Sequence, residues 1–169
     1  MKAILIGFMG SGKTTVGQLL AEQLKTKHID LDNLIVEEAG ESISEIFAKH
    51  GEAYFRKLEQ QILSKALKLP GILSTGGGTP TISANVSMLL ANKAPIIWLE
   101  TSNQATINHL KNDTSRPLIK DLDQEGLLKL KNQRSEQYEK IADLTIKTDC
   151  LTPLQIMLQI KDWLLRKDL

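Results

Sequence analysis

The fold of this chain follows from eight residues near its start: Gly7-Phe8-Met9-Gly10-Ser11-Gly12-Lys13-Thr14. They match the pattern G-x-x-x-x-G-K-[ST] of phosphate-binding loops, whose glycines let backbone N–H groups surround a phosphate. An apolar run from Ala3 to Ile6 precedes them and predicts a strand, and a helical apolar spacing follows over residues 13–24. This order places the phosphate at a helix N-terminus, where the dipole favours anions. A glycine-rich turn without this role is the weaker alternative, because the match is complete and correctly placed.

The residue types at the end of the loop suit a nucleoside triphosphate. The Lys13 ammonium supplies a mobile cation for the terminal phosphates, and the Thr14 hydroxyl offers Mg²⁺ a hard oxygen ligand. We therefore expect an ATP phosphate site made by Gly10, Ser11, Gly12, Lys13, Thr14 and Thr15.

The size and charge of the chain limit what can be built on this loop. A length of 169 residues predicts one domain over residues 1–169, and a net charge of +1 gives no electrostatic reason to expect nucleic acid or a membrane as partner. No apolar run approaches about 18 residues and no charged-then-apolar leader precedes the first strand, so we expect a soluble, cytoplasmic chain. Cys150 is the only cysteine, which excludes an internal disulfide and fits a reducing compartment.

Strand-like and helix-like patterns alternate along the chain. The expected strands cover residues 2–6, 27–30, 71–74, 95–99 and 143–147. The expected helices cover residues 13–25, 32–39, 42–50, 52–69, 83–91, 102–111, 123–141 and 153–167. This alternation predicts an α/β fold of three layers, in which helices flank a central parallel sheet of about five strands. Because ligands of such sheets bind beyond the carboxyl ends of the strands, reactive residues at those ends are candidates for a site.

Asp30-Leu31-Asp32 closes the second expected strand. If the strand persists, the two carboxylates point to the same side, towards the phosphate loop. Asp30 could then hold Mg²⁺, directly or through water, and Asp32 could accept a hydrogen bond or a proton from a substrate hydroxyl. The alternative is that Asp32 only caps the next helix while Asp30 is a turn residue, and the pattern alone does not separate the two.

Ser74-Thr75-Gly76-Gly77-Gly78 closes the third expected strand. Three consecutive glycines cost chain entropy, so we expect another group to approach this backbone closely, with a flexible turn as the alternative. The strand lacks the acidic residue that usually helps to bind Mg²⁺ in phosphate-loop proteins, which favours Asp30, together with Thr14, as the metal site.

Arginine is scarce in this chain, with four arginines against 17 lysines. A chain that otherwise uses lysine is expected to keep arginine where a planar, bidentate cation matters. Arg56 and Arg134 fall on expected helices, and Arg116 falls in a polar loop. Arg166 suits the dipole at the end of the last helix and receives no site role. A solvated surface cation is the ordinary alternative for each, and Arg56 could merely pair with Glu59 three residues on.

Together these motifs resemble those of the shikimate kinases, small P-loop kinases of aromatic amino-acid biosynthesis. The resemblance covers nearly the whole chain, and its motifs in this order are more specific than the phosphate loop, which alone would indicate only a superfamily. The matching residues are 4–14, Asp30, Asp32, Ile46-Phe47, Gly51-Glu52, Phe55-Arg56, Glu59, Ser74 to Gly78, Arg116-Pro117-Leu118 and the spacing of Arg134, Tyr138 and Ala142. The resemblance implies a P-loop kinase fold with a substrate-binding segment at about residues 32–63 and a lid at about residues 111–122.

The resemblance also implies roles for individual residues. Arg56 and Arg134 would clamp the carboxylate of shikimate, and Asp32 would hold ring hydroxyls, including the one that attacks. Phe47 and Phe55 would line an apolar wall. The implied substrate-binding set is Asp32, Arg56, Glu59, Gly77, Gly78 and Arg134. The implied catalytic set is Lys13, Asp32 and Arg116.

By the same resemblance, the chain is an ATP-dependent phosphotransferase. It would transfer the γ-phosphate of ATP to the 3-hydroxyl of shikimate as a monomer, with Mg²⁺ as cofactor held by Thr14 and Asp30. Arg116 of the lid would lie over the transferring phosphate and so bind ATP as well. Many relatives carry an arginine near His109 that stacks on adenine, and this departure leaves the adenine contact of the present chain open.

Two other interpretations compete with this one. A sugar-acid or nucleoside monophosphate kinase on the same fold is the nearest rival, since a phosphorylated acceptor also favours arginine. A nucleotide switch of the GTPase type is more distant. Asp123-Gln124-Glu125-Gly126 matches D-x-x-G but does not close an apolar strand, and Asn92-Lys93-Ala94-Pro95 lacks the Asp of a guanine-reading N-K-x-D.

Overall fold

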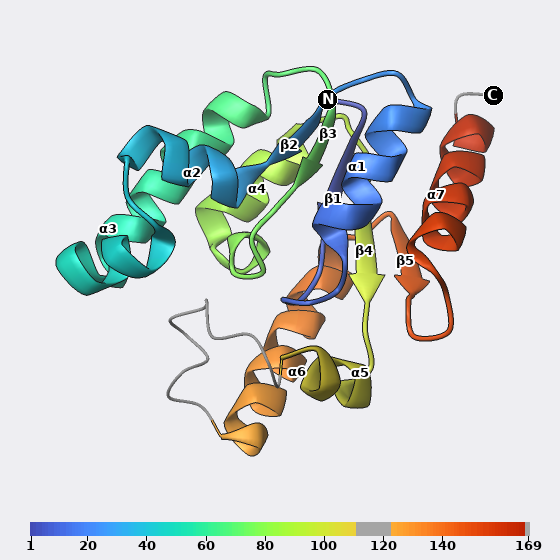
Figure 1. Ribbon diagram of the computed structural model, residues 1–169. Coiled ribbons are helices and arrows are strands. Elements are labelled where there is room, and N and C mark those ends of the chain that lie inside the picture. Colours follow the sequence, from blue (N-terminus) through green and yellow to red (C-terminus); the bar gives the residue numbers. More distant parts are fainter. Residues whose placement is uncertain (111–122, 168–169) are drawn as a thin grey trace.

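Five parallel strands form the central sheet of the protein, shown as a computed structural model in Figure 1. The structure describes residues 1–110 and 123–167. The strands are β1 (Ala3–Ile6), β2 (His28–Asp30), β3 (Ile72–Ser74), β4 (Ile96–Glu100) and β5 (Leu144–Lys147). They lie in the order β2-β3-β1-β4-β5, and every neighbouring pair is parallel. The prediction of an α/β fold with a parallel sheet of about five strands is therefore confirmed.

Helices connect these strands and cover the sheet. They are α1 (Lys13–Gln23), α2 (Leu31–Ala39), α3 (Ile43–Ala66), α4 (Ser83–Ala91), α5 (Asn103–Leu110), α6 (Gln124–Ile141) and α7 (Pro153–Lys167), with a 3₁₀ turn η1 (Thr79–Thr81). The helices expected over residues 42–50 and 52–69 form one element, α3. It is kinked at Gly51, whose φ of 81° and ψ of 172° are not helical.

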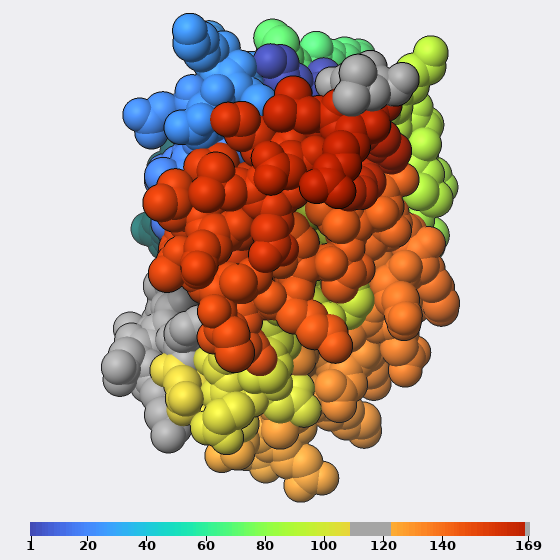
Figure 2. Space-filling view, turned by 90° about the vertical axis from the view of Figure 1, so that its right-hand side faces the viewer, coloured from blue at the N-terminus to red at the C-terminus, as the bar shows by residue number. Residues whose placement is uncertain are grey.

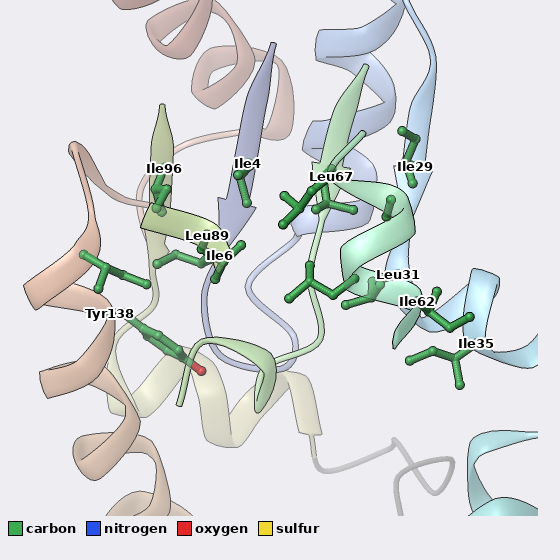
Figure 3. Close-up of a cluster of buried hydrophobic side chains, with 14 of the residues drawn as sticks. Ile4, Ile6, Ile29, Leu31, Ile35, Ile62, Leu67, Leu89, Ile96 and Tyr138 are labelled. Carbon is green, nitrogen blue, oxygen red and sulfur yellow. The ribbon is translucent and has the colours of Figure 1, made fainter. Parts of the chain in front are cut away.

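Two apolar clusters show which helices cover which face. Ala3 and Leu5 of β1 join a cluster with α1 and α7, whereas Ile4 and Ile6 join a larger cluster with α2, α3, α4 and α6. This alternation is expected of a strand that is buried on both sides. Figure 1 shows α1 in front of β1 and α7 beside β5, and Figure 2 shows α7, in red, on the outer surface. Figure 3 shows part of the larger cluster, with Tyr138 of α6 at its edge.

The sheet fixes where a ligand can lie. β1, the central strand, ends at Ile6 and leads into the glycine loop, and β3 beside it ends at Ser74, before the three glycines. β2, at the edge of the sheet, ends at Asp30. Since the strands are parallel, all three candidate groups lie at the same end of the sheet, beyond the carboxyl ends of its strands. No helix in residues 1–110 or 123–167 is long and apolar enough to cross a membrane.

Candidate active site

The glycine loop between β1 and α1 adopts a conformation that needs glycine. Gly10 and Gly12 have φ values of 76° and 84°, in the left-handed region, and a Cβ on Gly7 would lie 2.6 Å from Leu99 O. Gly12 is the N-cap of α1, so the first N–H groups of that helix open onto the loop. The loop can therefore surround an anion with backbone donors.

Lys13 lies inside this loop. Its Nζ donates to Gly7 O and Phe8 O, at 2.9 Å each, and to Ser11 Oγ at 3.3 Å. Only 9% of the residue is exposed, so water screens its charge poorly. An anion bound by the loop would meet this ammonium group at close range.

Asp30 and Asp32 lie close together, but not for the reason that the strand pattern predicts. β2 ends at Asp30 and α2 begins at Leu31, so the strand does not persist to Asp32. Asp30 itself caps the helix, because its Oδ1 accepts from the backbone N–H groups of Asp32 and Asn33 at 3.0 and 3.3 Å. The alternative in which Asp32 is the cap is therefore wrong, and Asp32 lies in the first turn of α2.

Thr14 and Asp30, the two predicted metal residues, are in direct contact. Thr14 Oγ1 donates to Asp30 Oδ2 at 2.8 Å. A hydroxyl and a carboxylate are hard oxygen ligands and suit Mg²⁺. The part of the chain that the structure describes contains no group of three or more His, Cys, Asp or Glu side chains that could hold a metal. A metal at this place would therefore take further ligands from phosphate oxygens and water, as Mg²⁺ does in kinases.

A cavity of about 230 Å³ connects the glycine loop to these carboxylates. Its walls are Gly10, Gly12, Lys13, Thr14, Thr15, Asp30, Asp32, Thr75, Gly76 and Gly77. Three segments that are far apart in the sequence thus meet around one space. The cavity has phosphate-binding donors on one wall and a carboxylate on another, as a phosphoryl transfer between two bound molecules requires.

Charged side chains crowd the glycine run, residues 76–78. A Cβ on Gly76 would lie 2.8 Å from Asp32 Oδ1, and a Cβ on Gly78 would lie 2.7 Å from Arg56 Nη2. The expectation that other groups approach this backbone closely is confirmed. Glycine is needed here because a side chain would displace the groups that line the site.

Arg56 is oriented by carboxylates of its own helix, α3. Its Nη1 lies 3.0 Å from Glu59 Oε2, and its Nη2 lies 3.3 Å from Glu52 Oε1. Glu59 is 1% exposed and also accepts from Thr79 Oγ1 at 2.8 Å and from Asn85 Nδ2 at 3.3 Å. The expected pair of Arg56 with Glu59 is thus present, and Glu59 holds the guanidinium against the glycine run. Thr79 and Asn85, which complete this network, were not anticipated from the sequence.

Arg134 reaches the glycine run from α6. The residue is 7% exposed, its guanidinium lies 5.6 Å from the centroid of the Phe8 ring, and a Cβ on Gly77 would lie 3.4 Å from its Nη1. Burial lowers the pKa of this guanidinium, and the charge of Arg56 lowers it further, although an arginine stays protonated. Within the described residues, Arg134 forms no ion pair with a carboxylate. Two neighbouring cations, one of them buried, favour a bound anion.

Tyr138 supports the glycine run from the core side. Its hydroxyl donates to Gly77 O at 2.5 Å, and the residue is 0% exposed. Figure 3 shows the Tyr138 ring with its hydroxyl oxygen. Burial raises the pKa of this hydroxyl, so it remains a donor at physiological pH. No sequence motif assigns Tyr138 a role, but its i, i+4 spacing from Arg134 places both on one face of α6 and is the signal that could have found it.

Phe47 and Phe55 meet across the kink of α3. Their ring centroids lie 4.7 Å apart, and the Arg56 guanidinium lies 5.2 Å from the centroid of Phe55. The two rings form an apolar surface next to a cation, which suits a ring compound that carries a negative charge.

A second cavity of about 230 Å³ adjoins the first at Gly10 and Gly12. No sequence motif predicts it, because most of its other walls come from α1, α5, α7 and the segments that follow β4 and β5. The other walls are Ser11, Val16, Thr101, Ala105, Thr148, Asp149, Leu151, Pro153 and Ile156. Thr101 Oγ1 is buried without a hydrogen-bond partner in the described part of the chain, so a polar group of a ligand could satisfy it.

Two predictions fall outside the described residues. They are Arg116 and the lid at residues 111–122, which follow the end of α5. The side chain of His109 is likewise not described.

Comparison with known proteins gives consistent results. A family model described as shikimate kinase matches residues 9–165. A shikimate kinase of Limosilactobacillus fermentum is 44% identical over 157 residues, which are 92% of this chain and 91% of the relative. A solved shikimate kinase from Acinetobacter baumannii, in complex with shikimate, has a TM-score of 0.94 and 31% identity over 99% of this chain and 94% of its own. The Aquifex aeolicus shikimate kinase has a TM-score of 0.85 and 32% identity over 99% and 98%.

Proposed function

The chain belongs to the shikimate kinase family, and we propose that its glycine loop, Asp32 and two guanidiniums carry the reaction of that family. The protein is an ATP-dependent kinase that phosphorylates a hydroxyl of shikimate. In the proposed reaction the 3-hydroxyl attacks the γ-phosphate of ATP, which gives shikimate 3-phosphate and ADP. One observation carries the assignment of residues: Asp32, Arg56 and Arg134 converge on the glycine run that borders the phosphate cavity.

We propose that ATP occupies both cavities. Its phosphates would lie in the glycine loop, where the N–H groups at the start of α1 and the Lys13 ammonium meet them. Its base would lie in the second cavity, between apolar groups of Leu151, Pro153 and Ile156. Thr101 Oγ1 would then gain a hydrogen-bond partner from the base.

The acceptor side of the site matches the chemistry of shikimate, a ring that carries a carboxylate and several hydroxyls. Arg56 and Arg134 offer two planar cations, each able to bind a carboxylate through two N–H groups. Phe47 and Phe55 would face the apolar part of the ring. Asp32 lines the phosphate cavity, so a hydroxyl bound to it would lie near the γ-phosphate.

An ATP-dependent kinase requires a divalent metal, and we propose Mg²⁺ at Thr14 and Asp30. Support comes from the contact between their oxygens at 2.8 Å on the wall of the phosphate cavity. When bound there, the metal would neutralise part of the charge of the β- and γ-phosphates.

The remaining work falls to side chains that position the reactants and neutralise charge, since phosphoryl transfer has a loose transition state. Lys13 would stabilise negative charge on the moving group. Asp32 would orient the attacking hydroxyl and take its proton late in the reaction. Arg116, which lies outside the described residues, is assigned by the resemblance alone, as a second cation on a lid whose closure would exclude water.

We further propose a monomer that acts in the cytoplasm. The family resemblance supports a monomer. Cys150 is free and exposed, as is usual in a reducing compartment.

A panel of acceptors tests the substrate. The purified protein receives ATP and Mg²⁺ with shikimate, with gluconate, with a nucleoside monophosphate or without acceptor, and ADP release and product mass are recorded. ADP release that depends on shikimate, with a phosphorylated shikimate as product, is the expected result. Equal release without shikimate, or preference for another acceptor, would overturn the proposal.

Substitution of the catalytic cations tests the residues. Lys13→Ala and Arg116→Ala are each expected to lower kcat by about a hundredfold or more, because each removes a charge that stabilises the transition state. Lys93→Ala, an exposed lysine between α4 and β4, serves as the control. Near-normal turnover in either variant would remove the role proposed for that residue.

A further inference from the structure

His28 and Ser74 connect the edge of the sheet to the first residue of α1. His28 Nε2 lies 2.9 Å from Ser74 Oγ, and Ser74 Oγ donates to Lys13 O at 3.0 Å. Ser74 is 1% exposed, and His28 is half-buried. A chain of hydrogen bonds, the relay, thus runs from β2 through β3 to α1.

The direction of the relay follows from the single proton of the serine hydroxyl. That proton goes to Lys13 O, so Ser74 Oγ accepts from His28, and His28 Nε2 must carry a hydrogen. The neutral Nε2–H tautomer and the imidazolium both meet this condition. The relay therefore persists in either protonation state of the ring.

Gly17 provides the space in which the relay forms. A Cβ on Gly17 would lie 2.6 Å from His28 Nε2 and 2.8 Å from Ser74 Oγ. No side chain of Gly17 separates α1 from these two groups, so the helix packs closely against them. About one turn earlier in α1, Thr14 Oγ1 donates a hydrogen bond to Asp30 Oδ2 of β2 at 2.8 Å. The first turn of α1 is thus attached by polar contacts to Asp30 and Ser74, the last residues of β2 and β3.

We propose that His28 and Ser74 are positioning residues for phosphoryl transfer, which fix the start of α1 relative to β3. On one side, Ser74 holds Lys13, the first residue of the phosphate-binding helix. On the other, β3 continues from Ser74 into Thr75 and the glycine run, where the acceptor would bind. Ser74 therefore connects the helix that would bind the phosphate donor to the segment that would bind the acceptor, and a displacement there would misalign the two reactants. This inference rests on the role proposed for Lys13.

Matched variants separate positioning from a merely structural role. Ser74→Ala removes both hydrogen bonds, and His28→Met removes the donor but keeps a long unbranched side chain. His28→Gln places an N–H donor near the position of Nε2 and is the rescue variant. For each variant and for the double variant Ser74→Ala/His28→Met, kcat, the two KM values and Tm are measured, with kinetics well below the lowest Tm.

The relay predicts a loss of turnover with little change in binding. Ser74→Ala should lower kcat by about tenfold and His28→Met by about threefold, with both KM values within about twofold of the parent. His28→Gln should restore kcat to within about twofold. The double variant should lose no more than Ser74→Ala alone, because both substitutions break the same chain of bonds.

Other outcomes overturn the inference. The first is an unchanged kcat in Ser74→Ala and His28→Met, with or without a lower Tm. The second is an effect confined to a higher KM for shikimate, and the third is a kcat of His28→Gln no higher than that of His28→Met. If Ser74→Ala does not fold, the two His28 variants, at the edge of the sheet, decide the matter. The variant Lys13→Ala distinguishes a failure of this inference from a failure of the catalytic role proposed for Lys13. Normal turnover in Lys13→Ala would contradict both the Lys13 role and the positioning role of the relay. An inactive Lys13→Ala together with a fully active Ser74→Ala would contradict only the positioning role.

Discussion

Arg134 is a buried cation beside the glycine run, and its environment predicts a selective kinetic effect. Burial of a charge costs stability unless an anion or a hydrogen-bonding partner offsets it. Arg134→Ala should therefore raise the KM for shikimate by about tenfold or more and the KM for ATP by less than about twofold, as expected for loss of a charged hydrogen bond. Steady-state kinetics with each substrate varied in turn measures both constants. Arg166→Ala, near the end of α7, is the control, and equal rises in both constants of Arg134→Ala would rule out the carboxylate clamp.

Lys131 is another buried cation of α6, and its hydrogen-bond partner is neutral. It is 6% exposed, and its Nζ donates to Asn103 Oδ1 at 2.9 Å. Burial lowers the pKa of Lys131, while the charges of Glu100 and Asp149 raise it to a lesser degree. Because the pKa is lower in the folded than in the unfolded chain, the ammonium form destabilises the fold. That cost is complete below the folded pKa and disappears as the pH rises above the unfolded pKa.

Replacement of Lys131 should therefore stabilise the protein in a pH-dependent way. Lys131→Met is expected to raise Tm by about 2–4 °C at neutral pH, since an apolar side chain of similar length avoids the cost of a buried charge. The gain should shrink as the pH rises towards about 11, where most of the parent lysine has lost its proton in both states. Thermal unfolding of both proteins across this range provides the measurement, with the exposed Lys129→Met as control. A Tm below that of the parent at neutral pH would contradict the prediction.

At the scale of elements, the turn from β3 into η1 shows how a backbone without side chains serves the site. Gly78 has φ −87° and ψ −18°, which alanine adopts without strain, but a Cβ there would meet Arg56 Nη2 at 2.7 Å. To make room for this Cβ, only the guanidinium end of the flexible Arg56 side chain must move. Gly78→Ala should therefore change Tm little, yet raise the KM for shikimate by about tenfold. Ser83→Ala, at the exposed start of α4, is the control. A large drop in Tm, or an unchanged KM, would show that Arg56 is not held as described.

Most elements could be predicted because each carries its own local signal. The glycine loop and the apolar runs around it define β1 and α1, and Gly51 marks the kink of α3. The boundary between β2 and α2 could not be predicted in the same way, since Asp30 and Asp32 are equally good caps in sequence. In the structure Asp30 is the cap, and it also accepts a hydrogen bond from Thr14 Oγ1, a residue 16 positions earlier in the chain.

At the scale of the whole molecule, the parallel sheet explains how much of the site the sequence could indicate. Parallel strands bring their carboxyl ends together, so motifs at the ends of β1, β2 and β3 had to meet. The acceptor residues followed from a resemblance of motifs, and their burial and contacts required the structure. The second cavity was not predictable, because its walls come from α1, α5, α7 and the segments that follow β4 and β5, through residues that form no local motif.

A crystal structure of the protein with ADP and shikimate would show whether these segments act on one pair of substrates. We expect the phosphates of ADP in the glycine loop, the carboxylate of shikimate in contact with Arg56 and Arg134, and its 3-hydroxyl beside Asp32. Shikimate bound elsewhere, with neither guanidinium within hydrogen-bonding distance of its carboxylate, would contradict the assignment of the site.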